Sequence, residues 1–222
     1  MRVIISAATM GEWMEAYLKI SPSYSGDSKR LNISFHESGV GMLASTFSLT
    51  KVALYEKPDL IIQAGIAGSF DNNIELGSTF IVQEETLGNT GVEEEGKWKD
   101  IFELKLEKSS YPPFEKRRLP NQWEKDYNLL KLPVVSSVTV NEISTNPVRI
   151  KQLISKYNPS LESMEGAALH YVCRKCDIPF LQIRSVSNYV GVRDKSQWKI
   201  AEALNNLNET LVQYVEKLYH LP

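Results

Sequence analysis

The sequence predicts an α/β fold with a mostly parallel or mixed central sheet flanked by helices. The main observation is that short β-branched and apolar runs alternate along the chain with longer segments of helical periodicity. The second is composition: 42% hydrophobic and 23% charged residues are ordinary globular values, which exclude a disordered chain. With 222 residues, the chain is long enough for a sizeable core, and we expect one domain covering 1–222.

The expected strands are short runs rich in valine, isoleucine and leucine, which are typical of strands buried on both faces. They are Arg2–Ala8, Leu60–Ala64, Thr79–Glu84, Val134–Val140 and Phe180–Val186.

The expected helices fill the segments between these strands. Leu43, Phe47 and Leu54 recur at helical spacing, and Pro58 ends that helix before the next strand. Further helices are expected after Pro147, near Glu165, and from about Ser196 to Leu218.

Residues 87–133 interrupt this alternation, because 18 of these 47 residues are charged and Pro112, Pro113 and Pro120 lie among them. Such a segment has little capacity to form a core of its own. A solvated excursion is the simplest interpretation. A lid or a subunit-contact loop is the alternative, since long loops in compact domains are often functional.

Charge and hydropathy exclude two classes of partner. The formal net charge of −2 gives no electrostatic footprint for nucleic acid. No apolar run approaches the roughly 20 residues that a membrane-spanning helix needs, and the apolar start of the chain is too short for a signal peptide. We therefore expect a cytoplasmic protein with no nucleic-acid or membrane partner.

The cysteines and histidines do not indicate a metal or redox centre. Cys173 and Cys176 have the spacing of a thiol redox pair, but their place late in a helical pattern favours ordinary helix cysteines. The three histidines are scattered without metal-ligand spacing, so we expect no metal.

Polar residues and glycines follow the predicted strands, where open α/β sheets bind their ligands. The loop from Ala7 to Glu12 lacks both the dinucleotide glycine fingerprint and the P-loop, so we expect no cofactor. The other features with polar residues and glycines are Ser38-Gly39-Val40-Gly41, Gly65-Ile66-Ala67-Gly68, Ser163-Met164-Glu165-Gly166-Ala167 and Arg184-Ser185-Val186-Ser187-Asn188. Each feature alone also has a structural explanation, because a glutamate can pair with a helix dipole and glycines allow turns.

Taken in this order, and with Lys57-Pro58-Asp59, these motifs resemble the nucleoside phosphorylase and nucleosidase superfamily. Within it, the chain is similar to the methylthioadenosine/adenosylhomocysteine nucleosidases and, more closely, to the futalosine hydrolases. The resemblance covers nearly the whole chain and implies cleavage of the N-glycosidic bond between a purine and ribose, without a cofactor. It also implies a homodimer or a larger homo-oligomer.

The resemblance assigns a role to each of three polar side chains. Glu12 would act as general base toward water, Glu165 would accept hydrogen bonds from the ribose hydroxyls, and Asn188 would hold the departing base. Further contacts with the nucleoside are implied for Gly65, Ile66, Ala67, Val140, Asn141 and Met164.

Residue types around the site favour water over phosphate as the nucleophile. The stretch from Ala7 to Tyr17 has no arginine or lysine to bind a phosphate dianion, and Glu12 would repel one. This favours a hydrolase over a phosphorylase.

Asn188 indicates the class of base. In the methylthioadenosine branch this position is an aspartate, which suits adenine. A 6-oxopurine presents two acceptors, O6 and N7, toward which an amide can donate and an ionised carboxylate cannot. Asn188 therefore favours hypoxanthine or guanine, and Ile66, where that branch commonly has serine, also departs from the adenine-specific pattern.

The stretch from Ser187 to Trp198 resembles the corresponding loop of futalosine hydrolases. Futalosine carries a benzoate on its 5′ side, and Arg193 is the candidate to bind that carboxylate, although pairing with Asp194 or a surface acid is an equal alternative. We therefore expect a futalosine hydrolase that releases hypoxanthine on a menaquinone-precursor route. The alternatives are a methylthioadenosine/adenosylhomocysteine nucleosidase, a purine nucleoside phosphorylase, or a nucleoside-binding module without catalysis.

Overall fold

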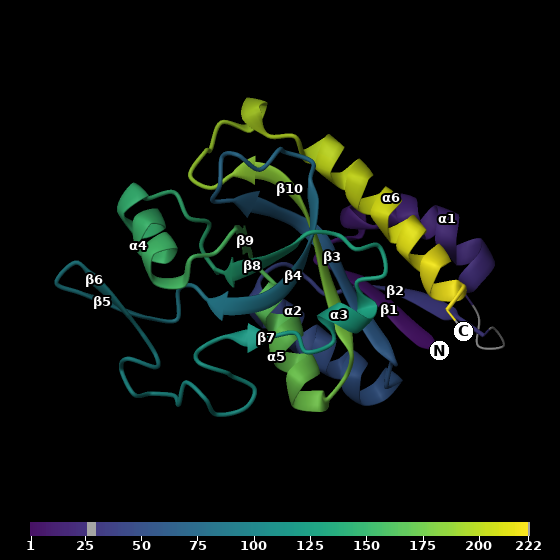
Figure 1. Cartoon of the computed structure of the whole chain (residues 1–222), viewed down its shortest axis with the longest axis horizontal. Helices are drawn as coiled ribbons and strands as arrows, with labels where there is room; N and C mark the ends of the chain where they lie inside the picture. The colour runs from purple at the N-terminus through teal and green to yellow at the C-terminus, as the bar shows by residue number, and fades with distance from the viewer. Residues whose placement is uncertain (26–29, 222) are drawn as a thin grey trace.

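The central element of the computed structural model, which describes residues 1–25 and 30–221, is a mixed β-sheet between two layers of helices (Figure 1). The strand order is β10-β4-β8-β9-β3-β1-β2, and β7 is added to β4. An additional pairing between β10 and β3 closes β10, β4, β8, β9 and β3 into a ring. The strands are β1 (Arg2–Ala7), β2 (Asn32–Glu37), β3 (Leu60–Ser69), β4 (Thr79–Leu87), β7 (Leu119–Pro120), β8 (Val134–Thr139), β9 (Leu161–Ser163) and β10 (Phe180–Tyr189).

Helices cover both faces of the sheet. α1 (Met14–Tyr24) and α6 (Ile200–Tyr219) pack on one face, and α2 (Met42–Lys51) and α5 (Gly166–Cys176) pack on the other (Figure 1). Side chains of a strand alternate between faces, so Val3 and Ile5 join the first layer while Ile4 joins the second. The remaining helices are η1 (Met10–Glu12), η2 (Val52–Glu56), α3 (Glu124–Tyr127), α4 (Pro147–Tyr157) and η3 (Lys195–Gln197).

The predicted fold class is confirmed, and all five predicted strands are present. The boundaries differ at the functional end, because β3 continues to Ser69 and β10 to Tyr189. Several elements were not predicted, among them β2 and α1. β2 lies at the end of the strand order and carries polar His36 and Glu37, so it has no continuous apolar run. α1 contains Pro22 and only two buried residues.

The predicted apolar stripe of α2 points to solvent. Leu43, Phe47 and Leu54 are 87%, 68% and 57% exposed, whereas Ser45 and Leu49 face the sheet. The helix was predicted from its periodicity, but the large apolar residues of that period do not contribute to the core of this chain.

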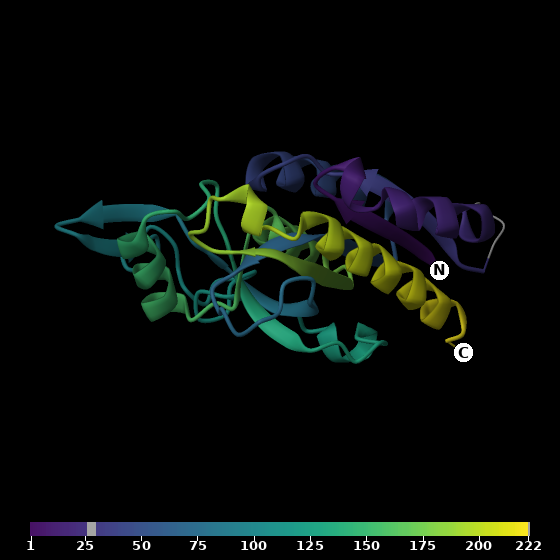
Figure 2. The ribbon, with the colours of Figure 1, turned by 90° about the horizontal axis from the view of Figure 1, so that it is seen from above.

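Residues 87–133 are more ordered than a solvated excursion. β5 (Gly91–Glu94) and β6 (Lys97–Asp100) form a hairpin that projects from the sheet (Figure 2). The hairpin is tied to α4 because the Trp98 indole donates to the Tyr157 hydroxyl at 3.1 Å. Further along, Phe114 and Leu119 are buried in a small apolar cluster. The segment thus packs against the domain, and none of its residues lines the cavity described below.

The cysteines lie in α5, as expected, and both are free thiols. Among the described residues, no helix has the length and hydropathy to cross a membrane.

Candidate active site

Glu12, Glu165 and Asn188 line one cavity of about 430 Å³. β1, β3 and β10 run parallel to one another, so the ends that precede Glu12 and carry Asn188 meet at the same edge of the sheet. Glu165 lies in the short connection between β9 and α5. Apolar groups, among them Val40, form much of the remaining wall. The three residues from distant parts of the sequence therefore share one hollow.

The Glu12 carboxylate is oriented by backbone amides. It lies in η1, where the Thr9 N–H donates to Oε2 at 3.1 Å, and the Ile66 N–H on β3 donates to Oε1 at 3.2 Å. Burial raises the pKa of Glu12, while the Arg184 charge and the two backbone hydrogen bonds act to lower it and Glu165 raises it. A half-buried carboxylate with a raised pKa is suited to accept a proton from water.

Glu165 joins two of the sequence motifs. It precedes the first residue of α5, and its Oε1 accepts a hydrogen bond from the Gly41 N–H at 2.9 Å. Gly41 has φ +87°, a conformation that favours glycine, which explains a glycine at this contact.

The small residues at the start of α5 allow it to approach the sheet closely. A side chain at Gly166 would collide with the Glu85 carboxylate, which is fully buried. Glu85 accepts a hydrogen bond from the Thr139 hydroxyl at 2.9 Å, and that hydroxyl accepts one from the Ala167 N–H at 2.8 Å. Burial raises the pKa of Glu85 to about 7. This network fixes the helix end that carries Glu165.

Arg184 is the site residue whose role the sequence did not reveal. It was expected to be a buried structural arginine, and it is 1% exposed on β10. Its Nη1 also lies 3.8 Å from Glu165 Oε2, and its charge opposes the rise that burial causes in the pKa of Glu12. Gly65 pairs with it on β3, and a side chain at Gly65 would collide with Nη1 and lie 3.0 Å from Glu12 Oε1.

Two glutamines complete the surroundings of this cation. The Arg184 Nε–H donates to Gln182 Oε1 at 2.9 Å, and Nη2 donates to Gln63 Oε1 at 2.8 Å. The guanidinium is therefore held behind the two cavity carboxylates. Two features of the sequence could have indicated this role. Arg184 is a charged residue inside an apolar run, and Gly65 directly follows another strand of the predicted sheet.

The Asn188 amide has a defined orientation. Its Oδ1 accepts a hydrogen bond from the Ser187 hydroxyl at 2.9 Å, and one of its N–H groups donates to the Tyr189 carbonyl at 3.1 Å. Because an amide nitrogen carries two hydrogens, one N–H donor is left for a ligand in the cavity.

The other predicted residues divide into two groups. Ile66, Ala67 and Met164 line the cavity, whereas Gly65 does not, because it faces Arg184. Arg193 is exposed and its guanidinium lies 5.2 Å from the ring centre of Trp198, which does line the cavity.

Val140 and Asn141 do not line the first cavity. Val140 lines a separate cavity of about 410 Å³, and Asn141 lines neither. β8 ends at Thr139, and between β8 and α4 only Ile143 lines the first cavity; Ile143 also lines the second. Sequence reasoning also missed Glu162, a buried carboxylate on β9 that lines the first cavity.

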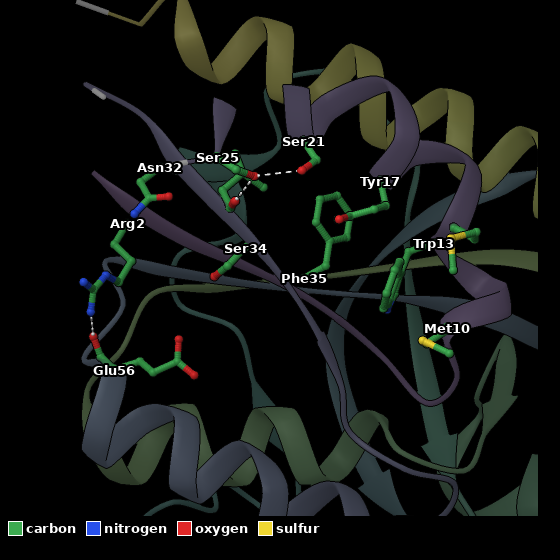
Figure 3. Close-up of a pocket in the computed structure, with 12 residues that line it drawn as sticks. Arg2, Met10, Trp13, Tyr17, Ser21, Ser25, Asn32, Ser34, Phe35 and Glu56 are labelled. Atoms are coloured by element: carbon green, nitrogen blue, oxygen red, sulfur yellow. Dashed lines mark hydrogen bonds between the residues drawn. The ribbon is translucent and has the colours of Figure 1, made fainter. Parts of the chain in front are cut away.

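A larger hollow of about 730 Å³ lies between α1 and β2. Figure 3 shows Trp13, Tyr17 and Phe35 along it, and their ring centres are 5.2–5.8 Å apart. Among the described residues, Glu56 is the single acid that lines it, and the Glu56 carbonyl accepts a hydrogen bond from Arg2 at 2.7 Å (Figure 3). The described part of this lining therefore offers no pair of carboxylates, which glycoside chemistry requires.

Across residues 1–25 and 30–221, no group of three or more histidine, cysteine, aspartate or glutamate side chains is arranged to hold a metal ion.

Comparison with known proteins agrees with the fold. The family model of the phosphorylase superfamily matches residues 20–218. Because this match covers most of the chain, the chain belongs to the phosphorylase superfamily.

Two kinds of enzyme are found among its relatives. Futalosine hydrolase of Thermus thermophilus is 28% identical over 180 residues, which cover 77% of this chain and 76% of that protein. The 5′-methylthioadenosine/S-adenosylhomocysteine nucleosidase of Pseudoalteromonas translucida is 26% identical over 199 residues, covering 88% and 84%. These names agree with the prediction of an N-glycosyl hydrolase.

Solved structures show the same fold. The Campylobacter jejuni 5′-methylthioadenosine/S-adenosylhomocysteine nucleosidase superposes with a TM-score of 0.78 at 16% identity, covering 100% of both chains. A futalosine hydrolase mutant of Helicobacter pylori superposes with a TM-score of 0.76 at 16% identity, covering 98% of this chain and 97% of that one.

Removing the charge of Arg184 tests the buried arrangement. We expect Arg184→Met to lower the free energy of unfolding by about 3–5 kcal/mol, because it leaves Glu165 without its cation and two glutamine oxygens without donors. Arg193→Met, at an exposed arginine, should cost less than about 1 kcal/mol. Urea denaturation measures both, and a loss below about 1 kcal/mol for Arg184→Met would contradict the arrangement.

Proposed function

We propose that this chain hydrolyses the N-glycosidic bond of futalosine and releases hypoxanthine. The observation that carries the proposal is the orientation of the Asn188 amide, whose oxygen is occupied by Ser187 and whose free N–H is available to an acceptor. Hypoxanthine offers the acceptors N7 and O6 on one edge. The Thermus thermophilus futalosine hydrolase among the relatives supports the same substrate.

In the proposed reaction, water attacks C1′ of the ribose while the bond from C1′ to the purine nitrogen breaks. Glu12 accepts the proton of the attacking water, a contribution worth roughly 10²–10⁴ in rate. The electron pair of the broken bond goes to the purine, where the hydrogen bond from Asn188 stabilises the developing negative charge. The amide is not an acid, so the proton that completes the free base arrives from water.

Glu165 would bind the ribose hydroxyls. Its Oε1 is held by Gly41, so its remaining lone pairs can accept hydrogen bonds from the sugar. Two carboxylates beside the ring also stabilise the positive charge that develops on the sugar in an oxocarbenium-like transition state. Arg184 favours the ionised form of Glu12, which a general base needs.

The second candidate is a methylthioadenosine/adenosylhomocysteine nucleosidase. It is favoured by the similarity to the Pseudoalteromonas translucida enzyme over 88% of this chain. The same two carboxylates would serve it, and the difference lies in the base that is released.

We also propose that the chain forms a homodimer through α2. The exposed apolar residues Leu43, Phe47, Leu54 and Tyr55 lie along this helix and the adjoining η2. Val40, which lines the cavity, is 59% exposed just before α2. Exposed apolar residues gathered on one helix and the segment that follows it are typical of an interface. A second copy is the occupant we propose, because an isologous contact would bury the same stripe on both chains.

A substrate panel tests the proposed function. Purified protein is incubated with futalosine, inosine and methylthioadenosine, with and without phosphate, and the free base is identified by chromatography. We expect hypoxanthine from futalosine at a rate independent of phosphate, and release of adenine slower by 10²-fold or more, since mismatched polar groups in a site can cost about 10⁴. Preferential release of adenine would instead establish the second candidate, and turnover only with phosphate would exclude hydrolysis.

Replacing Glu12 tests the general base. Glu12→Gln should lower kcat by roughly 10²–10⁴ while futalosine still binds, because the amide cannot accept the proton. Glu15→Gln, at an exposed position two residues into α1, is the control and should keep the rate. In the unsubstituted enzyme, kcat/KM should fall on acidification through a pKa above the usual range of a glutamate, because burial raises the pKa of Glu12. An unchanged rate in Glu12→Gln would contradict the assignment.

Charges on α2 test the interface. We expect the unsubstituted protein to have the mass of a dimer in light scattering. The double variant Leu43→Glu with Phe47→Glu should have the mass of a monomer, because both new carboxylates would be buried against an apolar partner surface. Leu106→Glu, at a residue 75% exposed elsewhere, should leave the mass unchanged. A monomeric unsubstituted protein would contradict the proposal.

A further inference from the structure

Glu162 on β9 is a buried carboxylate with an unused acceptor. The residue is 7% exposed, and it lines the same cavity as Glu12 and Asn188. Its Oε1 accepts a hydrogen bond from the Ser144 N–H at 3.0 Å, whereas its Oε2 is buried and has no hydrogen-bond partner among the described residues. An unsatisfied buried oxygen is costly. In a ligand cavity, such an oxygen indicates that the ligand supplies the missing donor.

The sheet register places Glu162 and Asn188 at the same level. Gly68 on β3 pairs with Glu162 on one side and with Asn188 on the other. Their backbones are thus two strand spacings apart, about 10 Å. Gly68 has no side chain between them, and a Cβ there would lie 3.3 Å from Asn188 Nδ2. Both polar side chains can therefore reach a flat ring lying across β3.

We propose that Glu162 is a second base-recognition residue, which accepts a hydrogen bond from the N1–H of a 6-oxopurine while Asn188 donates to its N7 and O6 side. This inference rests on the proposed function, because it concerns the base of the same nucleoside. A 6-oxopurine carries a hydrogen on N1, whereas adenine carries a lone pair there, toward which a carboxylate oxygen is repulsive. Together the two residues match both the donor and the acceptors of hypoxanthine.

The charge of Glu162 is compatible with this role. Burial raises the pKa of Glu162, while hydrogen bonds from the side chain and the backbone of Ser144 and the charge of Arg149 act to lower it. An N–H donor at Oε2 would favour the ionised carboxylate further. The base thus satisfies a group that is otherwise left without a partner.

Glu162→Gln separates recognition from structure. The glutamine oxygen can still accept from Ser144, so the loop contact is kept, but its other group becomes an N–H donor that cannot accept from N1–H. Glu142→Gln is the matched control, because Glu142 is exposed on the loop that carries Ser144 and lines the neighbouring cavity instead. Glu162→Ala is a second variant that also leaves room for a substituent on N1.

The test measures binding of hypoxanthine, 1-methylhypoxanthine and adenine to each protein by calorimetry. The unsubstituted protein and Glu142→Gln should prefer hypoxanthine to 1-methylhypoxanthine by about 10- to 100-fold, as expected for a hydrogen bond to a charged group. This preference should fall to within about threefold in Glu162→Ala, and in Glu162→Gln the affinity for adenine should rise relative to hypoxanthine.

The proposal would be overturned if Glu162→Ala preferred hypoxanthine to 1-methylhypoxanthine as strongly as the unsubstituted protein does. It would also be overturned if the unsubstituted protein bound the two compounds equally well. Futalosine hydrolysis by the unsubstituted protein is measured alongside. Its absence would refute the proposed function by itself, whereas hydrolysis combined with an unchanged preference in the variants would refute only the role of Glu162.

Discussion

The site depends on one buried cation. The guanidinium of Arg184 lies in the sheet behind the cavity, where an unpaired charge would cost several kcal/mol. It is compensated by Glu165 and by the side-chain oxygens of Gln63 and Gln182. The benefit is reciprocal, because burial favours the neutral form of the carboxyl group of Glu12, and the nearby cation opposes that effect. The absence of a side chain at Gly65 makes room for this arrangement.

β3 explains why residues far apart in the sequence converge. It pairs with β1, β9 and β10, so three chain segments that carry cavity residues are its direct neighbours. The Ile66 amide on β3 holds Glu12, and Gly68 separates Glu162 from Asn188. The ring formed by the additional pairing of β3 with β10 fixes β9 and β10 relative to one another, and with them Glu162 and Asn188.

The buried strands of the sheet, and the polar side chains at their ends, could be predicted from the sequence. Strands covered on both faces are continuous apolar runs, so the sheet was recognisable, and Glu12 and Asn188 follow from the strand ends. The sequence did not predict β2, which lies at the sheet edge without such a run. It also could not show the path of the chain after β8, where tertiary contacts direct Ile143, rather than Val140 or Asn141, to the cavity. Likewise, periodicity located α2 but could not show that its apolar stripe faces outward.

The most direct test of a single nucleoside site is a crystal structure of the protein with hypoxanthine bound. The account predicts the base in the cavity of Glu12 and Glu165, with Asn188 Nδ2 within about 3.2 Å of N7 or O6 and with N9 directed toward the two carboxylates. Hypoxanthine bound in the hollow between α1 and β2, or bound with the Asn188 amide turned away from it, would contradict the account.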